Sequence, residues 1–300
     1  MTIERTAART GETGLLWPNG KRVAVYVTAM LEVWSEGKAP TYTVQTTGLR
    51  SDVIYHGGIA WSRYGGHVGV WRILRALDDF SIRGTFAANA MITEIFPDAI
   101  EEIIRSGHDI AGHGVWQDQM INDMSPDEQH ETIKRTLDMF EKATGKRPEG
   151  WLSQVLAWTP ETPEFLVQEG VRWWGDAKDI DLPRKIKTKR GEIVAIPVCE
   201  FTDNRVLRGS PRDFFDVYKD TFDYLYRHEP MSVLNIILHC QWGGRPPIIA
   251  VFRQILDYIS QFPDVWFTTP GEIAAWFAAQ DRDEITYAER YFGPASEQQK

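Results

Sequence analysis

The sequence predicts an α/β fold, a distorted (β/α) barrel of about seven parallel strands. Continuous apolar and β-branched runs, such as residues 22–31 and 233–238, are typical of parallel strands buried on both faces. Amphipathic helical stretches separate these runs, so that strand and helix alternate about seven times. A chain of 300 residues with 43% hydrophobic residues can bury one large core. The alternation favours a barrel over an open sheet or a sandwich.

We expect one barrel domain over residues 21–280, an N-terminal arm over residues 1–20 and a C-terminal tail over residues 281–300. The arm is polar and punctuated by glycine, and its Trp17-Pro18-Asn19-Gly20 segment is typical of a turn. The arm is therefore expected to lie over the body of the barrel.

The first expected strand, residues 22–31, precedes a segment over residues 35–66 with little helical periodicity and many Gly, Pro, Ser and Thr residues. We interpret this segment as a long functional loop, because structureless loops of this length are rarely idle. Proline and acidic residues mark later helix starts, as at Ser125-Pro126-Asp127-Glu128. The basic run at residues 185–190 is expected to be a solvated turn.

The remaining expected elements alternate along the chain. Strands are expected over residues 84–88, between Gly107 and His113, and over residues 151–153, 171–174, 193–198, 233–239 and 265–268. Helices are expected from Val70 past Leu77, from Pro97 toward Ile104, from Pro126 past Phe140, from Thr162 to near Gly170, and over residues 211–227 and 247–260.

Charge and composition exclude several classes of function. The net charge of −9 and the pI near 5.4 argue against a surface for nucleic acid or an anionic membrane, because such surfaces are basic. No apolar run approaches the roughly 18 residues that span a bilayer, and the N-terminus lacks a signal-peptide pattern, so we expect a soluble, cytoplasmic protein. The two cysteines, Cys199 and Cys240, are too few for a disulfide framework or a cysteine zinc site.

Four ionisable residues stand at predicted strand ends: Glu32, His113, Asp176 and His239. In a parallel barrel the carboxyl ends of all strands open on one face, so these distant residues can converge there. Two imidazoles and two carboxylates form a plausible acid/base set for attack on an acyl carbon. The alternative is a structural role for each residue, as a buried histidine that caps a strand or a carboxylate paired with an arginine.

A zinc site is the main alternative for this face. His113 is followed four residues later by Gln117, and glutamine is a poor zinc ligand. Glu32 and His113 supply only two good ligands, while His108 points to the other face of the strand. We therefore expect no metal or other cofactor, and zinc held through Glu32 and His113 remains the alternative.

Several further residues are candidates for substrate binding. Arg245 lies close to His239, and its planar guanidinium could hold a carbonyl or carboxylate group, although pairing with a surface acid is the alternative. Three tryptophans neighbour the catalytic candidates and could line an aromatic pocket, although core packing would explain them equally well. The expected substrate-binding set is Arg245, Trp116, Gln117, Trp34, Trp242 and Tyr64. The sequence contains no Gly-x-Ser-x-Gly nucleophile motif and no phosphate-binding glycine loop.

Six sequence blocks occur in a characteristic order: Glu32 after the first strand; residues 64–72; Gly107-His108-Asp109-Ile110 with Gly112-His113-Gly114; residues 145–151; Asp176 with residues 179–183; and Leu238-His239-Cys240 with Gly244-Arg245-Pro246. Over roughly residues 20–277, the chain resembles the polysaccharide deacetylase (NodB-homology) superfamily, and within it the branch of bacterial allantoinases and cyclic imide hydrolases. The resemblance implies a NodB-like barrel of about seven strands. It also implies a homo-oligomer, a tetramer in this branch.

The metal-dependent members of this superfamily carry an Asp-Asp pair after the first strand and a His-x-x-x-His pair later. Here Met30-Leu31-Glu32 stands at the first place, and His113 with Gln117 stands at the second. Both departures match the allantoinase-like branch, which works without a tightly bound metal. The resemblance also implies that His239 is supported by Asp176. The arginine of the family's third motif is missing, because residues 150–153 read Gly-Trp-Leu-Ser.

We therefore expect a hydrolase that opens the C–N bond of a small cyclic amide, imide or ureide, such as an allantoin-, succinimide- or hydantoin-like ring. Glu32 or His113 would activate water, and His239, oriented by Asp176, would protonate the leaving nitrogen. Arg245 or backbone N–H groups near Gly114 would stabilise the oxyanion. The alternatives are a metal-dependent N-deacetylase of a carbohydrate or other amide, and a catalytically silent ligand-binding barrel.

Overall fold

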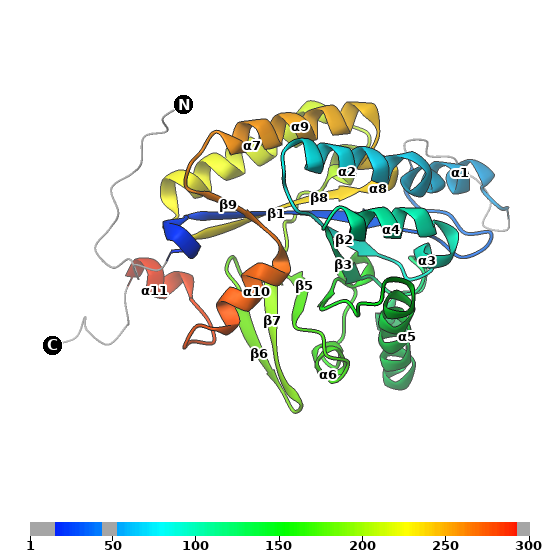
Figure 1. Ribbon diagram of the computed structural model, residues 1–300, viewed down its shortest axis with the longest axis horizontal. Helices are drawn as coiled ribbons and strands as arrows, with labels where there is room; N and C mark the ends of the chain where they lie inside the picture. Colours follow the sequence, from blue (N-terminus) through cyan, green and yellow to red (C-terminus); the bar gives the residue numbers. More distant parts are fainter. Residues whose placement is uncertain (1–15, 44–52, 293–300) are drawn as a thin grey trace.

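The computed structural model describes residues 16–43 and 53–292. Within them, nine strands form one sheet that curls into a half-barrel (Figure 1). The strands are β1 (Val23–Leu31), β2 (Thr85–Ala88), β3 (Asp109–Gly112), β4 (Gly150–Trp151), β5 (Trp173–Ala177), β6 (Arg184–Thr188), β7 (Gly191–Pro197), β8 (Ser232–His239) and β9 (Val265–Thr268). Their order is β6-β7-β5-β4-β3-β2-β1-β8, and β9 also pairs with β1. The predicted distorted (β/α) barrel is confirmed, and β6 is a strand that was not expected from the sequence.

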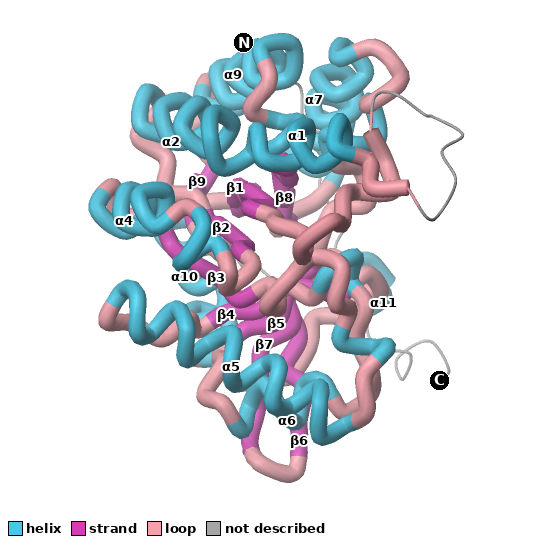
Figure 2. The backbone as a smooth tube through the Cα atoms, turned by 90° about the vertical axis from the view of Figure 1, so that its right-hand side faces the viewer, coloured by secondary structure: helices cyan, strands magenta, loops and turns pink. Residues whose placement is uncertain are grey.

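Helices flank the sheet and cover its outer surface (Figure 2). They are α1 (His56–Tyr64), α2 (Val70–Asp79), α3 (Ile92–Ile95), α4 (Pro97–Arg105), α5 (Pro126–Thr144), α6 (Thr162–Gln168), α7 (Pro211–His228), α8 (Cys240–Gly243), α9 (Pro246–Ser260), α10 (Pro270–Ala278) and α11 (Tyr287–Phe292). Short helical turns lie at Pro18–Gly20 (η1), Ile121–Asp123 (η3), Gln154–Leu156 (η4) and Asp203–Val206 (η5), and η2 (Gly65–Gly69) is a π-helical segment. Across the two described ranges, every helix is too short or too polar to cross a bilayer.

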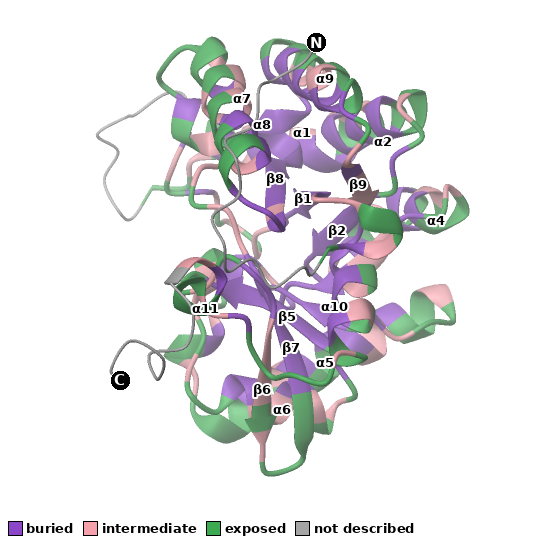
Figure 3. Cartoon of the chain, turned by 90° about the vertical axis from the view of Figure 1, so that its left-hand side faces the viewer, coloured by how far each residue is buried: buried purple, intermediate pink, exposed green. Residues whose placement is uncertain are grey.

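Strand β1 pairs with three other strands, and all nine of its residues are buried (Figure 3). One edge pairs in parallel with β8, from Val23 opposite Ser232 to Met30 opposite His239. The other edge is shared, because β9 pairs with its first half and β2 with its second half. Continuous burial explains why the sequence of this strand is apolar throughout instead of alternating.

The aromatic stripe on α7 belongs to the core of the chain itself. Phe214, Tyr218, Phe222 and Tyr226 are buried, and α7 packs beside α9 (Figure 1). Phe222 contacts the ring of Phe262 at a centroid distance of 4.9 Å. Packing inside one chain therefore accounts for this stripe.

The prediction of a long loop over residues 35–66 is wrong for its second half, where the chain forms α1 and the start of η2. Glycines 65 and 69 argue against a helix by intrinsic propensity, but they allow this helix to cross α8 closely. A Cβ atom on Gly69 would lie 1.8 Å from the carbonyl oxygen of Cys240, and one on Gly65 would lie 3.1 Å from the backbone nitrogen of Gln241. Tertiary packing has overridden local propensity here. Residues 44–52 of the expected loop lie outside the described residues.

The basic run is also only partly a turn. Residues up to Thr188 belong to β6, which pairs antiparallel with β7, and the turn is confined to the two residues between these strands. β6 is an edge strand, where exposed basic side chains discourage further pairing. Of the expected arm, Trp17 is buried, and its Nε1 donates to the carbonyl oxygen of Ser232 at 2.9 Å.

The close crossing of helices predicts that Gly69→Ala destabilises the protein. The added Cβ meets backbone rather than a movable side chain, so α8 must shift, and a loss of about 2–4 kcal/mol is expected. Urea unfolding measures this loss. Gly271→Ala is the matched control, because its Cβ would have no neighbour closer than 3.6 Å, and its stability should be unchanged or slightly higher. Equal stability of the two variants would contradict this explanation.

Candidate functional site

Three of the four predicted catalytic residues meet in one pocket of about 420 Å³. Glu32 follows β1, His113 follows β3, and His239 is the last residue of β8. The pocket lies where the carboxyl ends of these parallel strands converge, as the barrel prediction requires. All three side chains are nearly buried, with exposures of 4%, 1% and 9%.

Asn89, which sequence reasoning missed, links the two chain segments that carry Glu32 and His113 by hydrogen bonds. It follows β2 and is fully buried. Its Oδ1 accepts from the backbone N–H of Val33 at 2.9 Å, and its Nδ2 donates to the carbonyl oxygen of His113 at 2.6 Å. One amide therefore fixes the chain directly after Glu32 and at His113. The position of Asn89 directly after a buried strand is the feature from which the sequence could have predicted its role.

His239 forms a buried ion pair with Asp203 of η5. Its Nδ1 lies 2.6 Å from Oδ1 of Asp203, and its backbone N–H donates to Oδ2 at 2.8 Å. Burial alone would lower the pKa of His239, but the charges of Asp203 and Glu32 outweigh burial and raise it to about 9. His239 is therefore an imidazolium at neutral pH, and its Nε2 can donate a proton into the pocket.

The expected pairing of His239 with Asp176 is wrong. Asp176 lies within β5, where its carboxylate accepts from the backbone N–H of Ser153 at 2.9 Å and from Nε1 of Trp174 at 2.6 Å. It is absent from the described residues that line the pocket. Two carboxylates follow predicted strands, and only the three-dimensional path after β7 brings Asp203 rather than Asp176 to His239. The sequence could predict that a carboxylate pairs with His239, but not which aspartate it is.

His113 is oriented by the segment after β4. Its Nδ1 donates to the carbonyl oxygen of Leu152 at 2.8 Å, so in the neutral imidazole Nε2 carries the lone pair. Nε2 lies 3.7 Å from Oε1 of Glu32 and has no hydrogen-bond partner among the described residues. The two acceptor atoms therefore face one another across a gap at the edge of the pocket.

Glu32 is held by Gln241 of α8, a residue that sequence reasoning missed. Nε2 of Gln241 donates to Oε2 of Glu32 at 2.6 Å, and the hydroxyl of Tyr42 lies 3.4 Å from the same oxygen. Burial by itself would raise the pKa of Glu32, but the charge of His239, the nearby imidazole of His113 and the hydrogen bond from Gln241 lower it below the ordinary value. Glu32 is therefore a buried, ionised carboxylate beside a buried cation.

These side chains do not provide a full set of metal ligands. In the part of the chain that the structure describes, no three His, Cys, Asp or Glu side chains are grouped suitably. Glu32 and the unpartnered Nε2 of His113 are two suitable donors, whereas a protonated His239 cannot ligate. Gln117 would be a weak third ligand, and its Oε1 faces Nδ2 of Asn89 at 3.4 Å. The donor set does not fit a tightly held zinc ion.

Of the residues expected to bind substrate, Gln117 lines the pocket. Arg245 points elsewhere, with its guanidinium 4.1 Å from the ring centre of Tyr64 and its Nε donating to the carbonyl oxygen of Gln241. Nε1 of Trp242 donates to the carbonyl oxygen of Asp203 at 3.0 Å, so Trp242 helps to hold Asp203 in its place beside His239. The five expected residues that do not appear among the described lining residues are Arg245, Trp116, Trp34, Trp242 and Tyr64.

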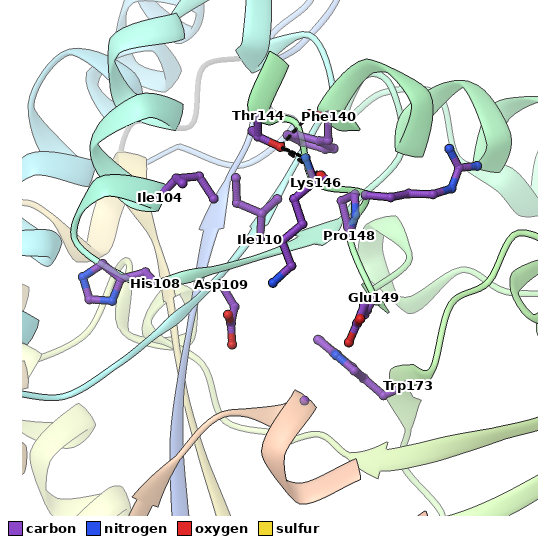
Figure 4. A pocket seen from close by; sticks show the side chains of 13 residues that line it. Ile104, His108, Asp109, Ile110, Phe140, Thr144, Lys146, Pro148, Glu149 and Trp173 are labelled. Carbon is purple, nitrogen blue, oxygen red and sulfur yellow. Dashed lines mark hydrogen bonds between the residues drawn. The ribbon is translucent and has the colours of Figure 1, made fainter. Parts of the chain in front are cut away.

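A second cavity, of about 80 Å³, lies at the opposite ends of the strands (Figure 4). It is lined by the first residues of β3, β4 and β5 and by Lys146 and Glu149. Its histidine, His108, accepts at Nδ1 from the backbone N–H of Gly84 at 3.0 Å, and burial lowers its pKa. His108 is therefore a neutral, structural histidine, and the larger pocket is the candidate active site.

The Asp203–His239 pair predicts a specific dependence of stability on pH. The pKa of His239 is about 9 in the folded protein and about 6.5 when unfolded, so this stabilisation is complete below pH 6.5 and is lost as pH rises through 9. Burial raises the pKa of Asp203 itself, which offsets part of this stabilisation, so Asp203→Asn should cost up to about 3 kcal/mol at pH 6 and much less at pH 10.

Urea unfolding at both pH values measures this difference. Asp79→Asn is the control, because it breaks an exposed pair with Arg253 and should cost little at either pH. An Asp203→Asn loss of equal size at pH 6 and pH 10 would contradict the ion pair.

Comparison with known proteins relates the chain to a family of hydrolases. The family model described as polysaccharide deacetylase matches residues 64–174. The crystal structure of the PuuE allantoinase is 28% identical with a TM-score of 0.78, and the match covers 89% of this chain and 94% of that one. A probable polysaccharide deacetylase from Pseudomonas aeruginosa PAO1 is 26% identical with the same TM-score, over 88% and 94%.

The peptidoglycan deacetylase of Helicobacter pylori is 22% identical over 248 residues, which cover 70% of this chain and 84% of that protein. The family model, the solved structures and this relative agree with the resemblance of the six sequence blocks. The shared fold and the pocket at the strand ends agree with it too. The chain therefore carries a polysaccharide deacetylase (NodB-homology) domain, and its family relationship is to hydrolases that act on C–N amide bonds.

Proposed function

We propose that the chain hydrolyses the C–N bond of a small cyclic amide, imide or ureide, by acid/base catalysis without a tightly bound metal. The observation that carries this proposal is the set of Glu32, His113 and the Asp203–His239 pair around one pocket. An ionised carboxylate and a buried imidazolium there supply a base and an acid. The likeness to the PuuE allantoinase over most of both chains supports a cyclic substrate.

Glu32 and His113 together would bind the attacking water. Their facing atoms are 3.7 Å apart, and a water about 2.8 Å from each can donate one hydrogen to Oε1 of Glu32 and the other to Nε2 of His113. The oxygen lone pairs of this water then face the pocket. As the water attacks the ring carbonyl carbon, Glu32 takes its proton.

His239 would complete the reaction as the general acid. When the tetrahedral intermediate collapses, the C–N bond breaks and Nε2 of His239 gives its proton to the departing nitrogen, because an amide anion is a poor leaving group. Asp203 keeps the proton on His239 beforehand and holds the ring in place through Nδ1. The proton on Glu32 returns to His239 through solvent, and the ring leaves as an open-chain acid.

Two neutral donors lining the pocket would stabilise the oxyanion in place of Arg245. Burial raises the pKa of Tyr42 well above its ordinary value, so its hydroxyl stays protonated, and its proton would turn from the long 3.4 Å contact with Oε2 of Glu32 to the oxyanion. Oε1 of Gln117 faces Nδ2 of Asn89, which leaves its amide N–H groups for the pocket. Fixed donors of this kind are worth about 10²–10³ in rate.

The test is ring opening of allantoin, succinimide, hydantoin and dihydrouracil, each with and without a strong chelator. We expect turnover of at least one ring that survives chelation. A loss on chelation that zinc restores would contradict metal-free catalysis. An oligomer of N-acetylglucosamine is the comparison substrate, because the Helicobacter pylori relative is named a peptidoglycan deacetylase. Deacetylation of this oligomer without any ring opening would overturn the cyclic substrate.

A further inference from the structure

Two consecutive residues beside the pocket hold a backbone conformation that side chains disfavour. Val155 has φ +47° and Leu156 has φ +58°, although neither is glycine. A branched side chain at Cβ makes this left-handed region especially unfavourable, so Val155 is a clear outlier. Such strain persists only where the surrounding structure imposes it, and it gathers at functional sites.

The residue before this strained pair, Gln154, has a fully buried side chain. Nε2 of Gln154 donates to the carbonyl oxygens of Trp116 at 3.1 Å and Gln119 at 2.9 Å, in the loop that follows His113. Gly114, at φ +74°, makes room for this amide, because a Cβ there would lie 1.9 Å from Nε2. The two hydrogen bonds from Gln154 therefore join the segment after β4 to the loop after β3.

Core packing does not explain why the chain keeps a strained valine at this place. Val155 is 63% exposed, so its side chain gains little from burial inside the protein. Both Val155 and Leu156 line the pocket of Glu32, His113 and His239. Their apolar side chains face a pocket whose rim also carries charged groups, Lys178, Glu200 and Arg205.

We propose that Val155 and Leu156 form a substrate-selecting wall, on which an apolar substituent of the ring packs during turnover. The strained backbone displays both side chains toward bound substrate, and the substrate then buries them. This inference rests on the proposed ring hydrolase, because it assigns the side-group preference of that same site. It extends that function to rings with an apolar side group, such as 5-alkyl hydantoins.

The first test shortens the side chains and keeps the backbone strain. Val155→Ala and Leu156→Ala should lower the ratio of kcat/KM for 5-isopropylhydantoin to kcat/KM for unsubstituted hydantoin by about tenfold or more, mainly through a higher KM for the substituted ring. If these side chains served only to support the structure, their loss would disturb the nearby Leu152 carbonyl that binds His113. In that case kcat would fall for both rings alike. An unchanged preference between the two rings would overturn the wall.

The second test measures the strain directly. Glycine tolerates positive φ, so Leu156→Gly should melt about 1–3 °C above Leu156→Ala, which reverses the order found at ordinary positions. Ser81 is the matched control, since it has φ +55° at the end of α2 and is not among the described residues that line the pocket. Ser81→Gly should also melt above Ser81→Ala, but neither should alter the ring preference. A lower melting temperature for Leu156→Gly would contradict the strain.

Failure of the proposed function and failure of the wall give different results. If wild type opens none of the rings, the hydrolase is wrong, and the wall is then tested by binding, as the rise in melting temperature with added 5-isopropylhydantoin. The wall predicts protection of wild type that weakens in Leu156→Ala. Protection of the two proteins to the same degree, or of neither, would overturn it.

Discussion

The buried contact between Asp203 and His239 sets the ionisation of the buried acid/base groups in the pocket. A carboxylate 2.6 Å from Nδ1 keeps His239 protonated, and that cation in turn helps to keep Glu32 ionised despite its burial. Removing one member of such a group leaves the other charges buried without compensation. The acid and the base of the proposed reaction therefore depend on each other before any substrate arrives.

The scaffold holds these charges through amide side chains and through the close approach of its helices. Asn89 binds the chain after β1 and after β3, which fixes the relative position of Glu32 and His113. Gly69 allows the α1–η2 helix to touch α8, the element that carries Gln241 to Glu32. The glycines of the sequence blocks thus act on the site indirectly, through the distance between helices.

Residues at strand ends could be predicted from the sequence because their position follows from one rule. An apolar strand that is buried on both faces belongs to a parallel sheet, and all such strands end on the same side. Glu32, His113 and His239 satisfy this rule. Asp203, Gln241 and Tyr42 lie in irregular or very short elements, where no periodicity marks the direction of a side chain. The choice of Asp176 over Asp203 failed for that reason. The helix of α1 and η2 was missed because Gly65 and Gly69 of η2 serve tertiary packing against α8.

The most direct measurement is the pH profile of kcat/KM for the best ring substrate, in wild type and in Asp203→Asn. This ratio reports the ionisations of the free enzyme. The account predicts that wild-type activity declines above about pH 9, as His239 loses its proton. In Asp203→Asn the decline should begin at lower pH, and the rate at pH 7 should fall by about 10²–10⁴. The same alkaline limb in both proteins would contradict the assignment of His239 as the acid.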